Sequence, residues 1–369
     1  MKADRSLSGL LALAYLMLLV YASLHPFEGW LWPAGATARE LLWLSWPPWR
    51  NRFDEWANLL GYLPFGAMLF AMMVRGGGGV AKALLVAVLL PSAVSYTMEV
   101  LQHFIPRRFP SQRDWFNNTL GALAGAAVAW LAQATGLMDL WDRLRERWLL
   151  PQSAPAAALL LIWPLGLLFP TAVPLGMGQI GPELRALVEW ATEGTPVQAW
   201  VEHYLQGPAS PLRPLSPLQE FMAIGCGLLA PCMLASAITR PGWRRGLLAP
   251  GAAAIALIVM TLSTALNFGP DHAGTWITRH TLQSLGVATA LGMLLTIAGP
   301  RVSAALGLVA LTAMVVLVAE APADPYYAAS LQGWEQGRFI HFHGLARWVG
   351  LLWPYVAIGW LVSRLARRG

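Results

Sequence analysis

Charged side chains are scarce in this sequence of 369 residues. Asp, Glu, Lys and Arg together make up 12% of it, whereas hydrophobic residues make up 56%. A soluble globular domain carries about twice that charged fraction. The apolar residues also occur in blocks of about twenty, long enough to cross the hydrocarbon core of a bilayer. The composition therefore excludes a soluble globular protein and predicts an all-α integral membrane protein.

Basic runs and catalytic signatures are also absent. The net charge of +6 comes without the interleaved basic and aromatic residues that follow a nucleic-acid backbone, so we expect no nucleic-acid partner. There is no nucleophile elbow, Walker loop or HExxH motif, and no cofactor is expected. Cys226 and Cys232 lie six residues apart in one apolar block, where a helix would point them to different faces and prevent a disulfide.

Hydropathy and helix-breaking residues predict about ten membrane-spanning helices. The apolar run from Leu7 to Leu24 is longer than that of a signal peptide, and no small-x-small cleavage site follows it, so we expect an uncleaved first span. The spans are expected near residues 7–24, 57–74, 80–101, 117–134, 154–172, 218–238, 247–266, 283–298, 302–319 and 345–363.

The distribution of basic residues predicts the orientation of these spans. Short loops around Arg143–Arg147 and Arg240–Arg245 are denser in Arg and Lys than the longer loops on the other side. Because cytoplasmic loops carry the excess of positive charge, both termini are predicted to be cytoplasmic. We expect a multi-pass protein of a bacterial inner (cytoplasmic) membrane.

Two amphipathic stretches are expected to lie along the membrane surface. The sequence LMDLWDRLRERWLL, residues 137–150, places Leu and Trp on one helical face and Asp and Arg on the other. It separates an N-terminal unit, residues 1–150 with about four spans, from a C-terminal unit, residues 151–369 with about six. Residues 174–217, on the predicted outer side, are also expected to form short interfacial helices.

The densest polar sequence, MEVLQHFIPRRFPSQRDWFNNTLGALAG, lies where the third and fourth spans meet on the outer side. Glu99, Gln102 and His103 share one face of the third span because they are three and four residues apart. Pro106 is expected to end that helix. The next helix is expected to open at Asp114.

The fourth and second spans also carry polar residues near their outer ends. Asn118 and then the small residues Gly121 and Gly125 follow Asp114 at helical spacing, and such glycines allow another helix to approach closely. In the second span, Asp54 and Asn58 are one turn apart and precede a predicted break at Pro64. We therefore expect three helix ends to bring carboxylates, amides and guanidinium groups together. The guanidinium groups are those of Arg107, Arg108 and Arg113 in the connecting loop.

These segments carry a family resemblance. DEWANLLGYLPFG, then Glu99 and Gln102, then RDWFNNTLGALAG, resemble the VanZ-like family of membrane proteins over roughly residues 10–132. The family is named for a low-level teicoplanin-resistance protein, and the resemblance implies a cell-envelope location, with a link to glycopeptide resistance, more than a mechanism. Many members have Lys after the acidic residue that matches Asp54, whereas this chain has Glu55. The residues that match the pattern are Glu99, Gln102, Arg113, Asp114, Asn118 and Gly121.

Three functions are compatible with this arrangement. The leading hypothesis is an outer-leaflet pocket between the second, third and fourth spans that engages an anionic lipid or a lipid-linked envelope precursor, because Arg can bind phosphate bidentately. The second is a membrane enzyme in which Glu99 or Asp114 acts as general base beside His103 and Arg113, on a phosphoryl or glycosyl substrate. The third is a lipid transporter or scramblase. A purely structural polar network remains the alternative to all three.

All seven histidines fall on the predicted outer side. The HFH sequence at 341–343, with Asp271, His272 and His280, offers N and O ligands, but a metal site needs three or four that converge, and no helix with closely spaced ligands is predicted. We therefore expect no metal site. The histidines are His25, His103, His203, His272, His280, His341 and His343.

Overall fold

The computed structural model describes residues 2–25, 27, 29–48, 52–106, 108–205, 215–319, 321 and 340–367. Within these ranges every element is a helix, apart from one isolated bridge between Leu149 and Thr239. The predicted all-α fold is therefore confirmed. The chain divides into two compact units, Met1–Arg147 and Trp148–Gly369, which are described separately below.

Helices lie at all ten predicted membrane-spanning positions, but they differ in length. Seven are long and apolar enough to cross a bilayer, or eight if α5 (Gln112–Ala134) is joined to α6 (Leu137–Trp148), from which it is bent by 75°. Shorter apolar stretches occur in α1 (Lys2–Leu24) and α7 (Ala154–Leu167). The chain is a multi-pass membrane protein, and the prediction of ten spans is approximate.

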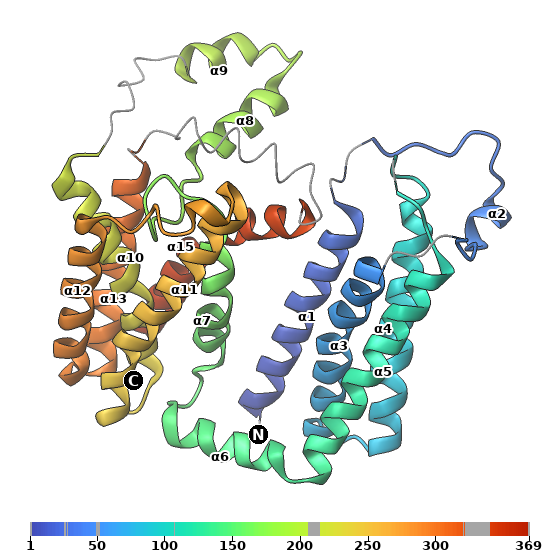
Figure 1. Ribbon diagram of the computed structural model, residues 1–369, viewed down its shortest axis with the longest axis horizontal. Coiled ribbons are helices and arrows are strands. Elements are labelled where there is room, and N and C mark those ends of the chain that lie inside the picture. The colour runs from blue at the N-terminus through green and yellow to red at the C-terminus, as the bar shows by residue number, and fades with distance from the viewer. Residues whose placement is uncertain are drawn as a thin grey trace. The chain divides into compact units, whose positions relative to one another are not determined.

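The N-terminal unit is a bundle of α1, α3 (Arg52–Arg75), α4 (Val80–Gln102) and α5 (Figure 1). The closest approach is between α3 and α5. A Cβ added to Gly121 would lie 2.1 Å from the Leu59 carbonyl oxygen, and one added to Gly125 would lie 1.8 Å from that of Leu63. The two glycines therefore do allow another helix to approach closely, and that helix is α3.

The predicted break at Pro64 is wrong, because α3 runs without interruption from Arg52 to Arg75. Proline removes one backbone N–H donor, but a membrane helix packed among neighbours tolerates that loss. Gly66, two residues further on, packs tightly against Ala122 of α5. A Cβ added to Gly66 would lie 2.1 Å from the Ala122 carbonyl oxygen. Packing against α5 thus supports the segment that contains the proline.

The amphipathic helix α6 follows α5 after a sharp turn. Gly136 adopts a φ of +73° at the turn, a conformation that glycine reaches without a steric penalty. None of the α6 side chains is buried, and Leu137 and Trp141 are each more than half exposed. Asp142 of α6 forms an ion pair with Arg75 at the end of α3, with an N–O distance of 2.7 Å. The exposed Leu137 and Trp141 side chains give α6 the apolar face that an interfacial helix requires.

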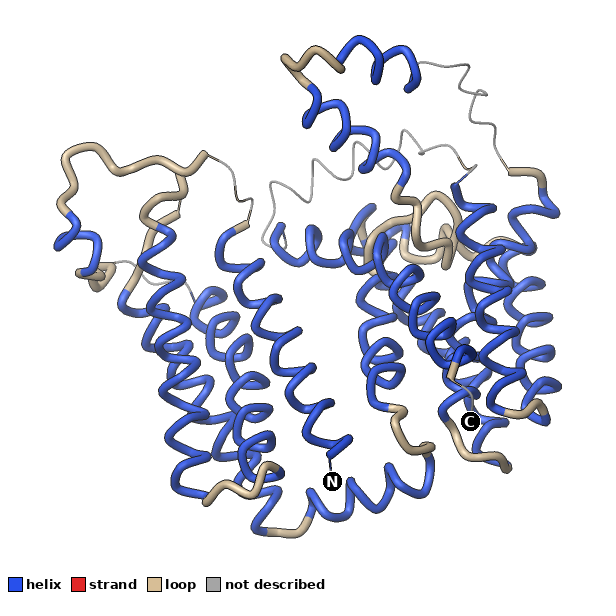
Figure 2. Tube along the Cα trace, turned by 180° about the vertical axis from the view of Figure 1, so that it is seen from behind, coloured by secondary structure: helices blue, strands red, loops and turns tan. Residues whose placement is uncertain are grey.

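The C-terminal unit is built around α10 (Pro217–Ile238), the most deeply buried of the candidate spans. Its described residues, like those of the N-terminal unit, form helices joined by loops (Figure 2). Helix α10 packs against α7, α11 (Leu248–Phe268), α12 (Arg279–Leu294) and α13 (Pro300–Ala319), whereas α15 (Ile340–Ala366) packs against α7 and α13. The predicted interfacial helices of residues 174–217 appear as two short helices, α8 (Gly181–Thr192) and α9 (Gln198–Leu205).

The fifth predicted span, 154–172, is too long. Helix α7 ends at Leu167, close to Pro170, and a residue that precedes proline is disfavoured in helical conformation. The chain then continues as irregular backbone that is buried inside the unit, where Leu175 and Met177 are at most 1% exposed. Both backbone polar groups of Gly178 in this segment are paired: its N–H donates to the Gly350 carbonyl, and its carbonyl accepts a hydrogen bond from the Tyr355 hydroxyl.

A buried arginine joins two helix ends in this unit. Arg245, 1% exposed, donates hydrogen bonds to the carbonyl oxygens of Thr239, after α10, and of Thr296 and Ala298, after α12. Carbonyl groups at helix C-termini lack partners within the helix and carry partial negative charge. A guanidinium group, with five donors, can satisfy several of them at once.

Candidate functional site

The segment before α3 is fixed against the ends of α4 and α5. Leu31 donates its backbone N–H to the Phe104 carbonyl at 2.9 Å, and Gln112 donates to the Ser45 carbonyl at 3.0 Å. The Tyr96 hydroxyl of α4 donates to the Leu42 carbonyl. These contacts hold residues 29–48, including the short helix α2 (Ala38–Leu42), beside the first turn of α5.

Ser111 connects the start of α5 to α4. Its hydroxyl accepts hydrogen bonds from the backbone N–H groups of Arg113 and Asp114, and its own N–H donates to Glu99 at 2.9 Å. The helix therefore begins at Gln112, two residues earlier than predicted. The Ser-x-x-Asp spacing before an apolar run is a recognised helix-start signal and would have placed the boundary correctly.

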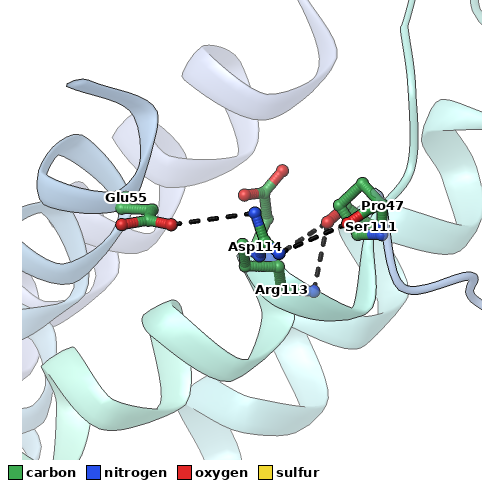
Figure 3. A network of polar contacts seen from close by, with 5 residues as sticks. All are labelled: Pro47, Glu55, Ser111, Arg113 and Asp114. Carbon is green, nitrogen blue, oxygen red and sulfur yellow. Dashed lines mark hydrogen bonds and ion pairs between the residues drawn. The ribbon is translucent and has the colours of Figure 1, made fainter. Parts of the chain in front are cut away.

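Arg113 lies between α3 and the preceding segment (Figure 3). Its guanidinium group donates to the Pro47 carbonyl at 3.3 Å, lies 3.8 Å from the Glu55 carboxylate and stacks over the Trp46 ring at 5.2 Å. The side chain is 17% exposed. An arginine held by a carbonyl, a ring and a carboxylate has a fixed position while a small part of its side chain stays exposed.

Asp114 lies next to Arg113 and faces the second span (Figure 3). Its carboxylate is hydrogen-bonded by the Asn58 side chain, feels attraction from Arg113 and feels repulsion from Asp54 and Glu55. Asp54 is exposed, whereas Asp114 is partly buried. The predicted approach of Asp54 and Asn58 from α3 toward Asp114 is therefore what the structure shows.

Glu99 lies deeper, among polar side chains that are almost completely buried. Glu99, Asn118, Tyr62 and Ser95 are each at most 4% exposed. Asn118 donates its amide N–H to the Ser95 hydroxyl at 2.8 Å, but its side-chain carbonyl oxygen has no hydrogen-bond partner among the described residues. The Tyr62 hydroxyl lies beside Ser95 and Glu99, and makes no hydrogen bond of ordinary geometry within the described residues.

Three predicted site residues face α1 or their own helix. Gln102 donates to the Ser23 carbonyl at 3.0 Å, and His103 has its Nδ1 3.3 Å from the Val100 carbonyl. Arg108 donates to the carbonyls of Ala22 and His25, at the C-terminal end of α1. Burial lowers the pKa of the Arg108 guanidinium, an effect that the nearby Glu99 carboxylate opposes. Arg107 lies outside the described residues.

We call the remaining group the helix-end cluster. Among its described residues and the neighbouring Arg108, four acidic side chains accompany two guanidinium groups, so acidic residues outnumber basic ones. Arg108 is engaged with the end of α1, which leaves Arg113 as the cation at the exposed edge. The cluster consists of Asp54, Glu55 and Asn58 from α3, Glu99 from α4, and Arg113, Asp114 and Asn118 from α5.

Within the described part of the chain, no three His, Cys, Asp or Glu side chains are grouped as a metal ion would need. The side chains of His341 and His343 lie outside the described residues. The residues that sequence reasoning overlooked are Ser95, Ser111 and Trp46. Only Ser95 could have been found by periodicity, because it lies four residues before Glu99 on the same face of α4.

Comparison with known proteins gives a family match for the N-terminal unit. The fold and the site define the class of this unit: it is a polytopic α-helical bundle with a polar cluster at one end of three helices. Residues 10–133 match the family described as VanZ/LLP1, as the motifs around Asp54, Glu99 and Asp114 predict. No curated protein and no solved structure matches the chain. The matched segment covers most of α1, all of α3 and α4, nearly all of α5 and the whole helix-end cluster.

Proposed function

We propose that this VanZ-like protein of a bacterial inner membrane has both termini in the cytoplasm and that the helix-end cluster lies at the outer leaflet. There it engages the phosphate-bearing headgroup of an anionic lipid or of a lipid-linked envelope precursor. The observation that carries the proposal is Arg113, a fixed and partly exposed guanidinium at the end of the bundle. Arginine at such a position binds phosphate through paired hydrogen bonds.

Exposed aromatic side chains around the cluster support a position at headgroup depth. Trp43 is 75% exposed, Trp46 55% and Phe109 73%. Large aromatic rings are enriched at both membrane–water interfaces, where one part of the ring is in apolar and another in polar surroundings. A headgroup next to Trp46 would also lie next to Arg113.

The proposal assigns the phosphate to one arginine and not to three. Arg108 donates to the carbonyls at the end of α1, so removing it would disturb the bundle before it disturbed a ligand. Arg113 instead contacts α3 and the segment before it, and its side chain is 17% exposed. A variant at Arg113 therefore tests ligand binding most cleanly.

The test is the identity and amount of lipid that copurifies with the full-length protein, measured by native mass spectrometry. Arg113→Gln should lower the retained phospholipid about tenfold, as expected for about 1.4 kcal/mol of lost interaction. Arg185→Gln in α8, an exposed arginine elsewhere in the chain, is the matched control. Equal retention in the wild type and Arg113→Gln, or equal loss in both variants, contradicts the proposal.

A second candidate is a membrane enzyme, and one specific observation favours it. Glu99 and Asp114 are close enough for their charges to interact, as paired carboxylates are in many general acid–base sites. Hydrolysis of a copurified lipid in proteoliposomes, lost in Glu99→Gln while lipid retention and folding stay normal, would favour the enzyme. Retention without turnover would favour binding alone.

A link to glycopeptide resistance requires that the ligand be a lipid-linked envelope precursor. Expression of the wild-type protein should then raise tolerance to teicoplanin in a susceptible bacterial host, and Arg113→Gln should not. The Arg185→Gln control should behave as the wild type does. Unchanged tolerance on expression of the wild type would leave a phospholipid as the ligand and remove the resistance role from the proposal.

A further inference from the structure

The interior of the helix-end cluster holds buried hydrogen-bond acceptors that the described residues do not fully satisfy. Glu99 accepts one hydrogen bond from Ser111, and the side-chain carbonyl of Asn118 accepts none within the described residues. Asn118 has already used an amide N–H on Ser95. A buried polar group without a partner costs free energy, of the order of 1–3 kcal/mol. A ligand that supplies the missing hydrogen bonds would recover that free energy.

The partner that fits is a donor with positive charge. Asp114 and Glu99 supply two neighbouring carboxylates, one partly exposed and one buried, with Asn118 and Tyr62 behind them. A phosphate would be repelled by these carboxylates and would stay with Arg113 at the edge. A protonated amine, by contrast, offers three N–H donors and a positive charge, as a lysine ammonium does.

We infer that the cluster recognises a headgroup in which a phosphate is linked to a primary amine, with the phosphate at Arg113 and the ammonium between Asp114, Glu99 and the Asn118 carbonyl. This inference rests on the proposed function and narrows its ligand. Phosphatidylethanolamine is the lipid source of this chemistry, and free phosphoethanolamine is a soluble source. The carboxylates select the amine, and the guanidinium anchors the phosphate.

The groups that face the ammonium come from three helices, which gives the site geometric selectivity. Tyr62 and Asn58 belong to α3, Glu99 to α4, and Asp114 and Asn118 to α5. The close contact between α3 and α5 fixes the distance between the α3 residues and the α5 residues of this group. A trimethylated amine has no N–H to donate and is larger, so it should be rejected.

The experiment measures retention of lipids with identical acyl chains by the full-length protein in native mass spectrometry. The probes are phosphatidylethanolamine, phosphatidylglycerol and phosphatidylcholine. We expect phosphatidylethanolamine to be retained about tenfold over each of the others. Displacement of it by phosphoethanolamine at equal concentration would identify the soluble molecule as the source, whereas no displacement would identify the lipid.

Variants separate this inference from the proposed function. Glu99→Gln and Asp114→Asn should each abolish the preference for the amine while phosphatidylglycerol is retained as before. Arg113→Gln should weaken phosphatidylethanolamine and phosphatidylglycerol alike. Tyr62→Phe removes only a hydroxyl and keeps the ring packed, so it reports on the interior if a charge variant fails to fold; we expect it to reduce the preference about threefold. Glu40→Gln in α2 changes an exposed carboxylate outside the cluster and should have no effect.

Equal retention of the amine-bearing and amine-free phospholipids by the wild type would overturn the inference and assign water to the unpaired atoms. The proposed function would survive that result if Arg113→Gln still lowered the retention of both lipids. A preference for the amine that persists in Glu99→Gln, Asp114→Asn and Tyr62→Phe, with each variant folded, would also overturn it.

Discussion

At the scale of single residues, arginine performs two different tasks in this protein. Arg108 and Arg245 donate to carbonyl groups at the ends of helices, whereas Arg113 is stacked on a ring at the edge of a carboxylate cluster. In the first task the guanidinium supplies donors that the helix ends lack. In the second its charge remains partly exposed. The same side chain thus pairs with helix ends in one place and, in the proposed function, is available to a ligand in another.

Arg245→Lys should destabilise the C-terminal unit. A lysine ammonium is a single point donor and cannot reach the carbonyls after both α10 and α12 at once, so we expect a loss of about 1–3 kcal/mol. The control is Arg244→Lys, since Arg244 stacks on Trp148 and Trp243 at a partly exposed position. Thermal unfolding of both variants in detergent measures the difference, and equal melting temperatures would contradict the role of Arg245.

Gly125→Ala tests the contact between α3 and α5. The added methyl would lie 1.8 Å from the Leu63 carbonyl oxygen, so the two helices must separate, at a cost of about 1–3 kcal/mol or more. Gly61→Ala on α3 is the control because an added Cβ there meets no atom within 4 Å. Thermal unfolding should show a lower melting temperature for Gly125→Ala only. A melting temperature for Gly125→Ala at or above that of Gly61→Ala would contradict the packing.

The sequence predicts some of the residue contacts and leaves others open, for a physical reason. Glu99, Asp114 and Asn118 belong to the same end of the bundle because helical spacing and a short loop bring the end of α4 and the start of α5 together. The partners of Gln102 and Arg108 depend on where α1 packs, which no local pattern specifies. The pairing of Arg113 with Glu55 and Trp46 likewise depends on a long segment folding back over α5.

At the scale of elements, hydropathy places the helices well and their ends less well. Polar residues such as Asp54 and Arg113 lie in the first turns of α3 and α5, so both helices extend beyond their apolar blocks. Conversely α7 ends at Leu167, shortly before Pro170, although the apolar block continues beyond it. Hydropathy predicts which residues lie within the bilayer, whereas the first and last residues of a helix depend on backbone hydrogen bonding.

The short helices α8 and α9 are expected to lie along the membrane. None of the α8 side chains is buried in the protein, and Leu187 and Trp190 are 56% and 73% exposed. In lipid vesicles a protease that cuts after Glu should therefore cleave slowly at Glu189 and Glu193 and faster once detergent removes the bilayer. Rapid cleavage near Gly194 in intact vesicles would show that this segment stands free of the membrane.

At the scale of the whole molecule, the account requires one orientation in the membrane. If both termini are cytoplasmic, the helix-end cluster faces outward and Arg75, at the opposite end of α3, faces inward. A cytoplasmic reporter fused after Gly77 or at the C-terminus should be active, and a periplasmic reporter should be active after Thr37. An active periplasmic reporter at the C-terminus would change the number of spans, and one active after Gly77 would invert the N-terminal unit.

The central claim is that a lipid phosphate lies at the edge of the helix-end cluster. The most direct measurement is photocrosslinking of the full-length protein, in vesicles, with a phospholipid that carries the photoreactive group in its headgroup, followed by peptide mapping. The account predicts that labelling concentrates on the peptides that contain Trp46 and Arg113 and falls several-fold in Arg113→Gln. Labelling spread evenly over the loops of both units, or unchanged in Arg113→Gln, would contradict it.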